Sequence, residues 1–273
     1  MKRILLIGQN SYLSKQLKTH LLTKSKGYMV NAISALSEQW QALPFGLYDW
    51  IIDLEAVTPW QEEDAPSPSP EAYFQVNRDL ARDLARKAKE EGCTHFLYIS
   101  TIEVYGFEPR AGKTIQIEKN TPCRPITDYG KSKLAGEDAI KELEEDGFQA
   151  AILRLPMVYG PGCPGEYEAF RKLAASGCKL PSMAGQKSAI HISTLCAFVQ
   201  YLIEQTLSGT LHPQNKDYLS PLALLQLAAK EEDAQIRTSW LTGLKYRLFP
   251  GSVPKEIHQI FGGLVYGKEI DLG

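Results

Sequence analysis

Short apolar runs alternate with longer segments of helical periodicity in the N-terminal half of the chain. The apolar runs lie at 3–7, 28–33, 50–52, 95–100 and 150–155. Such runs are typical of strands buried in a parallel sheet. Between them, apolar residues recur every three or four positions, which predicts helices, the two longest over 70–91 and 131–145. This alternation predicts an α/β fold with a doubly wound parallel sheet of the Rossmann type.

The pattern loosens after residue 162. We expect helices over 166–176, 194–207 and 221–229 and a short strand over 189–192. These elements indicate a smaller lobe attached to the sheet. We therefore predict a dinucleotide-binding domain over 1–162, to which 186–207 returns, and a substrate-binding lobe formed by 163–185 and 208–273.

Composition narrows the class of protein but does not identify it. The 273 residues are 44% hydrophobic and 23% charged, which is ordinary for a globular protein, and the formal net charge is -2. This charge predicts no nucleic-acid partner and no membrane partner, although a local basic surface can be hidden in the total. The apolar run at the N-terminus is too short for a signal peptide, so we expect a cytoplasmic protein. The five cysteines show no ligand spacing and predict free thiols and no metal site.

The first strand ends at Gly8, and a helix follows after a short turn. This order is typical of a dinucleotide-binding unit, in which the helix N-terminus faces a pyrophosphate. Ser11 and Ser14 stand where further glycines are expected, and Ser34 stands where an acidic residue often binds a ribose. The carboxylates of Asp53 and Glu55 would repel a pyrophosphate, or they cap the next turn. A plain turn after a strand is the alternative interpretation.

Tyr129 and Lys133 lie four residues apart on a predicted helix for which Asp128 is a candidate cap, so they share one face. A neighbouring ammonium favours phenolate and lowers the pKa of a tyrosine toward the range of a general acid/base. The spacing also arises by chance, and a solvated helix face is the alternative. Thr101 follows the strand at 95–100, where ligands bind in open parallel sheets, whereas Asn77 beside an apolar stripe is typical of a satisfied core residue.

Several stretches occur together in a specific order. They are the Gly8 turn, 98–106, the Tyr-Gly-Lys-Ser-Lys stretch at 129–133 with 134–137 behind it, 153–162 and 186–192. Over nearly all its length the sequence resembles the NAD-dependent epimerase/dehydratase family, also called extended short-chain dehydrogenase/reductases, and in particular its nucleotide-sugar 4-epimerases. The tail is short for that family.

The resemblance implies roles for individual residues. Tyr129 would be the acid/base, Lys133 would bind the nicotinamide ribose and lower the pKa of that tyrosine, and Thr101 would hydrogen-bond the reacting oxygen. The implied cofactor is NAD, with NADP as the alternative if Ser34 contacts a 2'-phosphate. The implied cofactor contacts are Gly8, Ser11, Tyr12, Leu13, Ser34, Leu54, Asn77, Lys133 and Pro156. The implied substrate contacts are Thr101, Glu103, Met157 and Lys187, the last on a diphosphate.

The resemblance predicts a nucleotide-sugar epimerase. Dehydratases of the family carry Asp-Glu after the catalytic threonine, and Ile102 and Glu103 here argue against dehydration. An NAD(P)H-dependent reductase of a keto sugar or other carbonyl is one alternative. A non-catalytic nucleotide-binding or regulatory protein with a degenerate cofactor turn is the other. Relatives that pair through a helix bundle make a homodimer a reasonable expectation.

Overall fold

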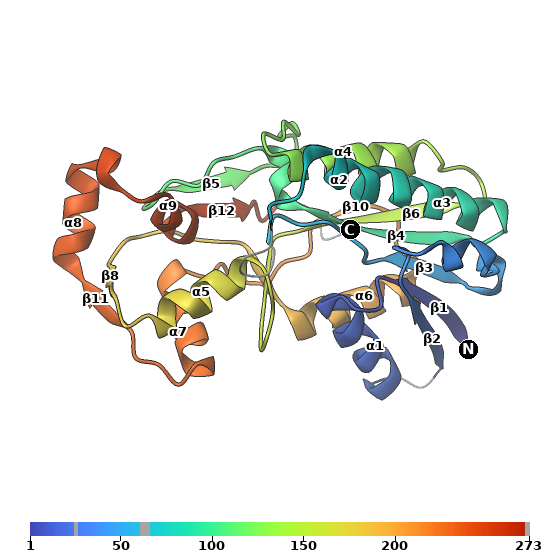
Figure 1. The fold of residues 1–273 in the computed structure, drawn as a ribbon, viewed down its shortest axis with the longest axis horizontal. Coiled ribbons are helices and arrows are strands. Elements are labelled where there is room, and N and C mark those ends of the chain that lie inside the picture. The colour runs from blue at the N-terminus through green and yellow to red at the C-terminus, as the bar shows by residue number, and fades with distance from the viewer. Residues whose placement is uncertain (25–26, 61–65, 271–273) are drawn as a thin grey trace.

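A computed structural model describes residues 1–24, 27–60 and 66–270. Figure 1 shows an α/β body on the right, which holds the N-terminus, and a smaller lobe on the left. Within the described ranges, no helix combines the length and hydrophobicity needed to cross a lipid bilayer.

The body is built on a parallel sheet, as predicted. Its order is β10-β6-β4-β3-β1-β2. The strands are β1 (Lys2–Ile7), β2 (Tyr28–Ile33), β3 (Trp50–Asp53), β4 (His95–Thr101), β6 (Gln149–Leu155) and β10 (Gly209–Leu211). The chain runs outward from β1 to β2 and then returns to β3 on the other side of β1. The carboxyl ends of β1 and β3 therefore form a topological switch point, which is where open α/β sheets bind ligands.

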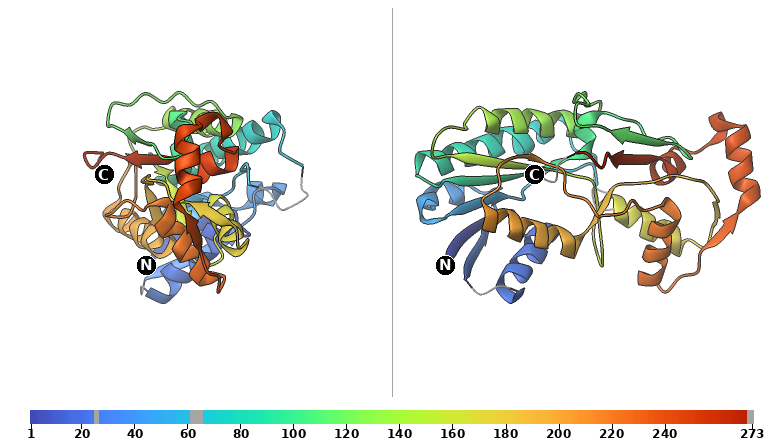
Figure 2. Two further views of the ribbon diagram at one scale, coloured as in Figure 1. Left: turned by 90° about the vertical axis from the view of Figure 1, so that its left-hand side faces the viewer. Right: turned by 180° about the vertical axis from the view of Figure 1, so that it is seen from behind.

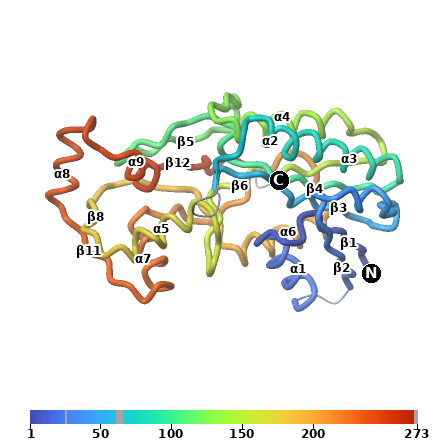
Figure 3. The backbone as a smooth tube through the Cα atoms, viewed as in Figure 1, coloured from blue at the N-terminus to red at the C-terminus, as the bar shows by residue number. Residues whose placement is uncertain are grey.

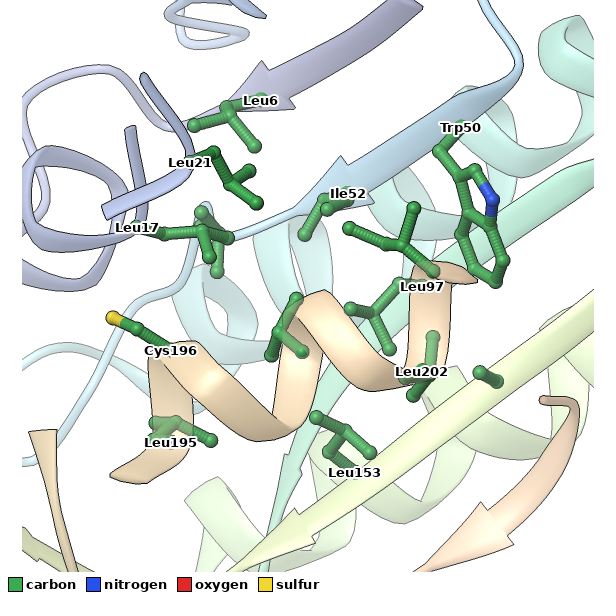
Figure 4. Close-up of a cluster of buried hydrophobic side chains, with 14 of the residues drawn as sticks. Leu6, Leu17, Leu21, Trp50, Ile52, Leu97, Leu153, Leu195, Cys196 and Leu202 are labelled. Atoms are coloured by element: carbon green, nitrogen blue, oxygen red, sulfur yellow. The ribbon is translucent and has the colours of Figure 1, made fainter. Parts of the chain in front are cut away.

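Helices cover both faces of this sheet (Figure 1). Helices α1 (Tyr12–Lys24) and α6 (Ile192–Gln205) cover one face. Figure 4 shows the apolar side chains that they bury against β1, β3, β4 and β6. The other face is covered by α3 (Ala81–Glu90) and α4 (Asp128–Lys141). Because both faces of the sheet are covered, the central strands are largely apolar, which is why the sequence predicted them, whereas the short edge strand β10 was not predicted.

Two helices differ in detail from the prediction. The helix expected over 70–91 is α2 (Pro70–Phe74), a π-helical turn (Gln75–Leu80) and α3 in succession. The cap of α4 is Thr127, whose hydroxyl accepts from the Gly130 amide at 3.0 Å, so the expectation of Asp128 as the cap was wrong. Thr127 has the extended backbone that a cap requires, whereas Asp128 is already inside the helix.

The lobe contains α5 (Glu166–Ala175) and α7 (Pro221–Glu231), which pack on each other around an apolar cluster. It also contains elements that the sequence did not predict. They are β8 (Lys179–Pro181), β11 (Arg237–Ser239), α8 (Trp240–Leu248) and α9 (Lys255–Phe261). In Figure 3, α8 lies at the end of the molecule farthest from the sheet.

Body and lobe are joined by short parallel pairs. Strand β7 (Met157–Tyr159) pairs with β9 (Ala189–His191), and β5 (Thr114–Ile117) pairs with β12 (Gly263–Tyr266). We expected residues 208–273 in the lobe, but β10 is the edge strand of the main sheet beside β6. The reason is that β10 follows α6 directly, and this helix returns the chain to the sheet. The division into two domains stays a prediction.

Candidate active site

The turn after β1 has the backbone geometry that its sequence predicted. Gly8 has φ +96°, and a Cβ there would lie 2.8 Å from the backbone nitrogen of Glu55 and from the Leu54 carbonyl. The Ser11 hydroxyl accepts from the Ser14 amide at 3.2 Å and caps the start of α1. Gly8 is therefore fixed both by its conformation and by the close approach of the chain after β3.

The side chain of Ser14 is buried, and within the described part of the chain its hydroxyl has no hydrogen-bond partner. Buried hydroxyls are normally paired. Together, the left-handed turn at Gly8, the orphaned Ser14 hydroxyl and the N-terminus of α1 fit an anionic group such as a pyrophosphate.

Glu55 crosses the carboxyl end of β1 and reaches the residues after β2. Its Oε2 accepts from the Ser34 hydroxyl and the Ala35 amide, each at 3.3 Å. The carboxylate that Ser34 lacks is therefore supplied by the strand two places away in the sheet. From the sequence, Glu55 was expected either to repel a pyrophosphate or to cap the next turn, and not to reach Ser34. The sequence signal for this contact was an acidic residue shortly after a buried strand. The direction in which its side chain points depends on the order of the strands in the sheet.

Asp53 and Asn77 organise the chain after β3. The Asp53 carboxylate accepts from the Glu55 amide at 3.0 Å, which agrees with the capping interpretation. The Asn77 amide donates to the Val57 carbonyl at 2.9 Å and to the Ser132 hydroxyl at 3.0 Å, and its oxygen accepts from the Val57 amide. Asn77 is thus a satisfied core residue that holds the loop after β3. Direct contact of Asn77 with a cofactor stays a prediction.

Thr101 and Tyr129 meet at the carboxyl end of β4. Thr101 is the last residue of β4, and its hydroxyl accepts from the Glu103 amide at 3.2 Å. Tyr129 lies in the first turn of α4. Burial raises the pKa of Tyr129, and the negative charge of Glu103 raises it further, whereas a hydrogen bond with Thr101 lowers it.

Lys133 is aimed at the sheet. Its ammonium donates to the Ile99 carbonyl at 2.9 Å and lies 4.6 Å from the ring centroid of Tyr98, and the residue is 2% exposed. Burial lowers the pKa of Lys133, while the nearby Asp53 carboxylate acts in the opposite direction. We expected Lys133 to lower the pKa of Tyr129. In this structure the pKa of Tyr129 is raised instead, because its burial dominates and the ammonium faces β4 and Asp53.

A cavity of about 670 Å³ lies between the body and the lobe. Three of the predicted substrate residues, Glu103, Met157 and Lys187, line it, and Thr101 and Tyr129 do not. The Lys187 ammonium donates to Glu166 and to the Gln259 carbonyl, each at 2.9 Å. Glu103 connects the cavity with Tyr129. This residue lines the cavity, and its negative charge raises the pKa of Tyr129.

The remaining predicted residues border the same edge of the sheet. The Tyr12 hydroxyl donates to the Pro161 carbonyl at 2.9 Å, and Leu13 packs against the core cluster that contains Leu54. Pro156 lies between β6 and β7. The predicted cofactor residues thus lie along the carboxyl ends of the central strands. Their contacts with a cofactor stay predictions.

An open parallel sheet, a glycine turn at its switch point and a Tyr/Lys pair on a helix beside β4 define a Rossmann-type fold of the extended short-chain dehydrogenase/reductase class. Residues 48–181 match the model of the NAD dependent epimerase/dehydratase family. Over these residues, which are nearly half of its length, the chain is similar to this family.

Three known proteins illustrate the range of similarity. The UDP-glucose 4-epimerase of Vibrio cholerae is 33% identical over 110 residues, which are 40% of this chain and 33% of that protein. The chain therefore spans about a third of the length of this curated relative.

Among solved structures, dTDP-4-dehydrorhamnose reductase from Bacillus anthracis in complex with NADP superposes with a TM-score of 0.69 at 20% identity, over 98% of this chain and 90% of that one. UDP-glucuronic acid 4-epimerase from Bacillus cereus in complex with NAD gives 0.68 at 16% identity, over 95% and 97%. At these sequence identities, the two superpositions show a similarity of fold alone.

Proposed function

We propose that this protein is an NAD-dependent nucleotide-sugar epimerase in which Tyr129 is the acid/base. The observation that carries the proposal is the placement of Tyr129, in the first turn of α4, beside Thr101 at the carboxyl end of β4 and the cavity residue Glu103. A phenol beside a second hydroxyl is suited to exchange a proton with a sugar hydroxyl. The match to the family model and the similarity to the UDP-glucose 4-epimerase of Vibrio cholerae support this reaction class.

Each residue of the site has a defined task. Tyr129 takes the proton of a sugar hydroxyl and later returns it, and Thr101 orients that oxygen. Lys133 holds the hydroxyls of the nicotinamide ribose, for which its ammonium must turn from the Ile99 carbonyl. The cofactor, when bound, supplies the hydride acceptor and donor. The proton tasks fall on side chains that lie on β4 and α4.

Glu55 supports NAD over NADP as the cofactor. Its carboxylate lies beside Ser34 and Ala35, at the end of the strand where acidic residues bind a ribose 2'-hydroxyl. The same carboxylate repels a 2'-phosphate. This replaces the earlier expectation that Ser34 contacts a 2'-phosphate. A tightly held NAD is what an epimerase needs, because its cofactor is regenerated within each turnover.

The substrate we propose is a nucleoside diphosphate sugar in the cavity between body and lobe. Lys187 is a candidate for the diphosphate, provided that it exchanges Glu166 for the phosphate oxygens. The UDP-glucuronic acid 4-epimerase of Bacillus cereus, a neighbour in fold, is named for a substrate of this class. A cytoplasmic location and a homodimer belong to the same proposal.

Two other functions have specific support. The dTDP-4-dehydrorhamnose reductase of Bacillus anthracis shares the fold equally well, which supports a reductase of a keto sugar. A non-catalytic nucleotide-binding protein is supported by Glu55, if this side chain excludes the cofactor. A net oxidation or reduction of the cofactor separates the reductase from the epimerase.

The test is a titration of the purified protein with NAD, NADH, NADP and NADPH, after checking which cofactor co-purifies. The epimerase predicts retained or tightly bound NAD, followed by interconversion of UDP-sugars without net NADH. Consumption of NADPH with a keto sugar would support the reductase. If none of the four binds at millimolar concentration, the non-catalytic function stands.

A further inference from the structure

Helix α8 exposes an unusual amount of apolar surface. Five of the fifteen large hydrophobic side chains that the structure exposes lie within 240–249. They are Trp240 (68% exposed), Leu241 (60%), Leu244 (43%), Leu248 (63%) and Phe249 (63%). Scattered exposed apolar residues are normal, but a contiguous group marks an interaction site.

Four of these residues form one face of α8 with a basic rim, and Phe249 follows directly after the helix. At 3.6 residues per turn, Trp240, Leu244 and Leu248 lie one above the other, and Leu241 lies beside them. Lys245 and Arg247 fall at the two edges of this face. The opposite side holds Gly243, where a Cβ would lie 2.4 Å from the Ser182 carbonyl oxygen, so the helix is anchored to the lobe by its back. We call the five apolar residues with Lys245 and Arg247 the α8 patch.

The segment that carries the patch is basic, although acidic residues flank it in the sequence at 231–233 and 256. The segment 236–255 contains Arg237, Lys245, Arg247 and Lys255 and no acidic residue. Strand β8, which packs under α8, adds Lys179 opposite Arg237. Among the described residues, none of these five cations has an ion pair within 4.0 Å. The net charge of -2 conceals this local excess.

We propose that the α8 patch docks on an anionic lipid surface. An apolar face that carries tryptophan, leucine and phenylalanine and is rimmed by lysine and arginine suits a helix lying in the membrane interface. A second copy of this chain fits less well, because a two-fold contact through this face would bring the same basic rims together. The inference replaces the expectation of no membrane partner and does not rest on the proposed epimerase activity.

The position of the patch adds a consequence for the cavity. Figure 2 (left) looks onto the end of the molecule where α8 lies. Pro250, directly after the patch, and Lys255, at the start of α9, both line the cavity between body and lobe. Docking through α8 therefore brings this wall of the cavity close to the headgroups.

The experiment measures co-sedimentation of the full chain with vesicles of phosphatidylcholine alone and of equimolar phosphatidylcholine and phosphatidylglycerol. Two variants test the patch, Leu244→Ser/Leu248→Ser for its apolar face and Lys245→Glu/Arg247→Glu for its rim. The matched control is Leu22→Ser/Lys24→Glu on α1, which changes an exposed leucine and an exposed lysine elsewhere. Circular dichroism checks that every variant is folded.

We expect the wild type and the control to bind the anionic vesicles, and added salt to weaken this binding. The rim variant should lose at least about tenfold in partition coefficient, since it reverses two basic residues that each contribute about fivefold near an anionic surface. The apolar variant should lose at least about tenfold as well, since it removes two leucines from the face that enters the membrane interface. Absence of wild-type binding, equal binding by the patch variants, or a wild-type dimer that the patch variants convert to monomers would each overturn the proposal.

Discussion

The carboxyl edge of the sheet holds two half-sites that match the pattern of the resembled family to different degrees. The proton-transfer half, on β4 and α4, has all three side chains that the family resemblance requires, Thr101, Tyr129 and Lys133. The cofactor half, at β1 to β3, keeps Gly8 but carries serines and a glutamate where small or differently placed residues were expected. A dinucleotide turn depends mainly on backbone shape, whereas proton transfer depends on particular side chains. We therefore expect a departure from the family pattern to impair function less in the cofactor half than in the proton-transfer half.

Beside the β3–β4 pairing and the Asn77–Ser132 hydrogen bond, a pair of buried charged groups couples the two halves. The Asp53 carboxylate ends β3 in the cofactor half, and its charge raises the pKa of Lys133 in the proton-transfer half. Burial opposes it by lowering the pKa of the same ammonium. Changes confined to one half are thus expected to have separable effects, except at this pair.

Tyr129→Phe is expected to give the largest difference between the effect on turnover and the effect on affinity for NAD. Removing the phenol should lower turnover by about a thousandfold, since acid/base groups contribute on that scale. Affinity for NAD should stay nearly unchanged, because the phenol is proposed to act on the sugar. Steady-state rates and cofactor titration measure the two effects. Tyr73→Phe is the control, with its ring centroid 6.1 Å from that of Tyr129. Full activity of the Tyr129 variant would remove this residue from the mechanism.

The cofactor half is broken most directly by Gly8→Ala. A Cβ at Gly8 meets backbone at 2.8 Å, while Gly92 has a similar φ of +84° with open space around it. Both substitutions should reduce the free energy of unfolding by about 1–2 kcal/mol through the left-handed backbone. Only Gly8→Ala should also weaken NAD binding. The expected loss in affinity is tenfold or more, and tenfold corresponds to about 1.4 kcal/mol. Urea unfolding and cofactor titration separate the effects, and an equal loss of NAD affinity at both glycines would contradict the close approach.

Glu55→Gln tests which way the carboxylate acts on the cofactor. If the Glu55 carboxylate binds the ribose, the variant should lose affinity for NAD and gain affinity for NADP. The ratio of the two dissociation constants should then change by about tenfold, which corresponds to about 1.4 kcal/mol. If Glu55 instead blocks the site, affinity for both cofactors should rise together. Dissociation constants for NAD and NADP distinguish these results. Ser34→Ala, which removes only a hydroxyl partner, is the milder control.

The smallest effect is expected from Asp53→Asn, and it depends on pH. Loss of the carboxylate lowers the pKa of Lys133, so the ammonium is lost at a lower pH and NAD affinity declines earlier as pH rises. Burial also raises the pKa of Asp53 above its unfolded value, so the folded state holds this proton more tightly. The stability from this group is present at low pH and lost as pH rises through the raised pKa, a dependence the variant should lack. Superimposable pH profiles of wild type and variant would contradict the coupling.

The sequence predicted the central strands because they are buried on both faces, and it also gave the bounds of the edge strand β2, but it did not predict β10 at the other edge. It did not predict β5 and β12, whose pairing joins residues about half the chain apart. The directions in which side chains point could not be predicted from the sequence either. Glu55 reaches Ser34 only because β1 lies between their strands, and Lys133 faces Asp53 only because β3 and β4 are neighbours. The pattern of apolar residues along the chain indicates which residues are buried, whereas these contacts depend on the order of the strands in the sheet.

The central claim is that the cofactor half still holds NAD and the proton-transfer half acts on a sugar bound beside it. The direct measurement is the ultraviolet absorbance of enzyme-bound NADH after UDP-sugars are mixed with NAD-loaded protein. The account predicts a transient signal in the wild type that decays without free NADH, and no signal in Tyr129→Phe. NAD-loaded wild type that converts no UDP-sugar and never forms the signal, or a signal that persists in the variant, would contradict it.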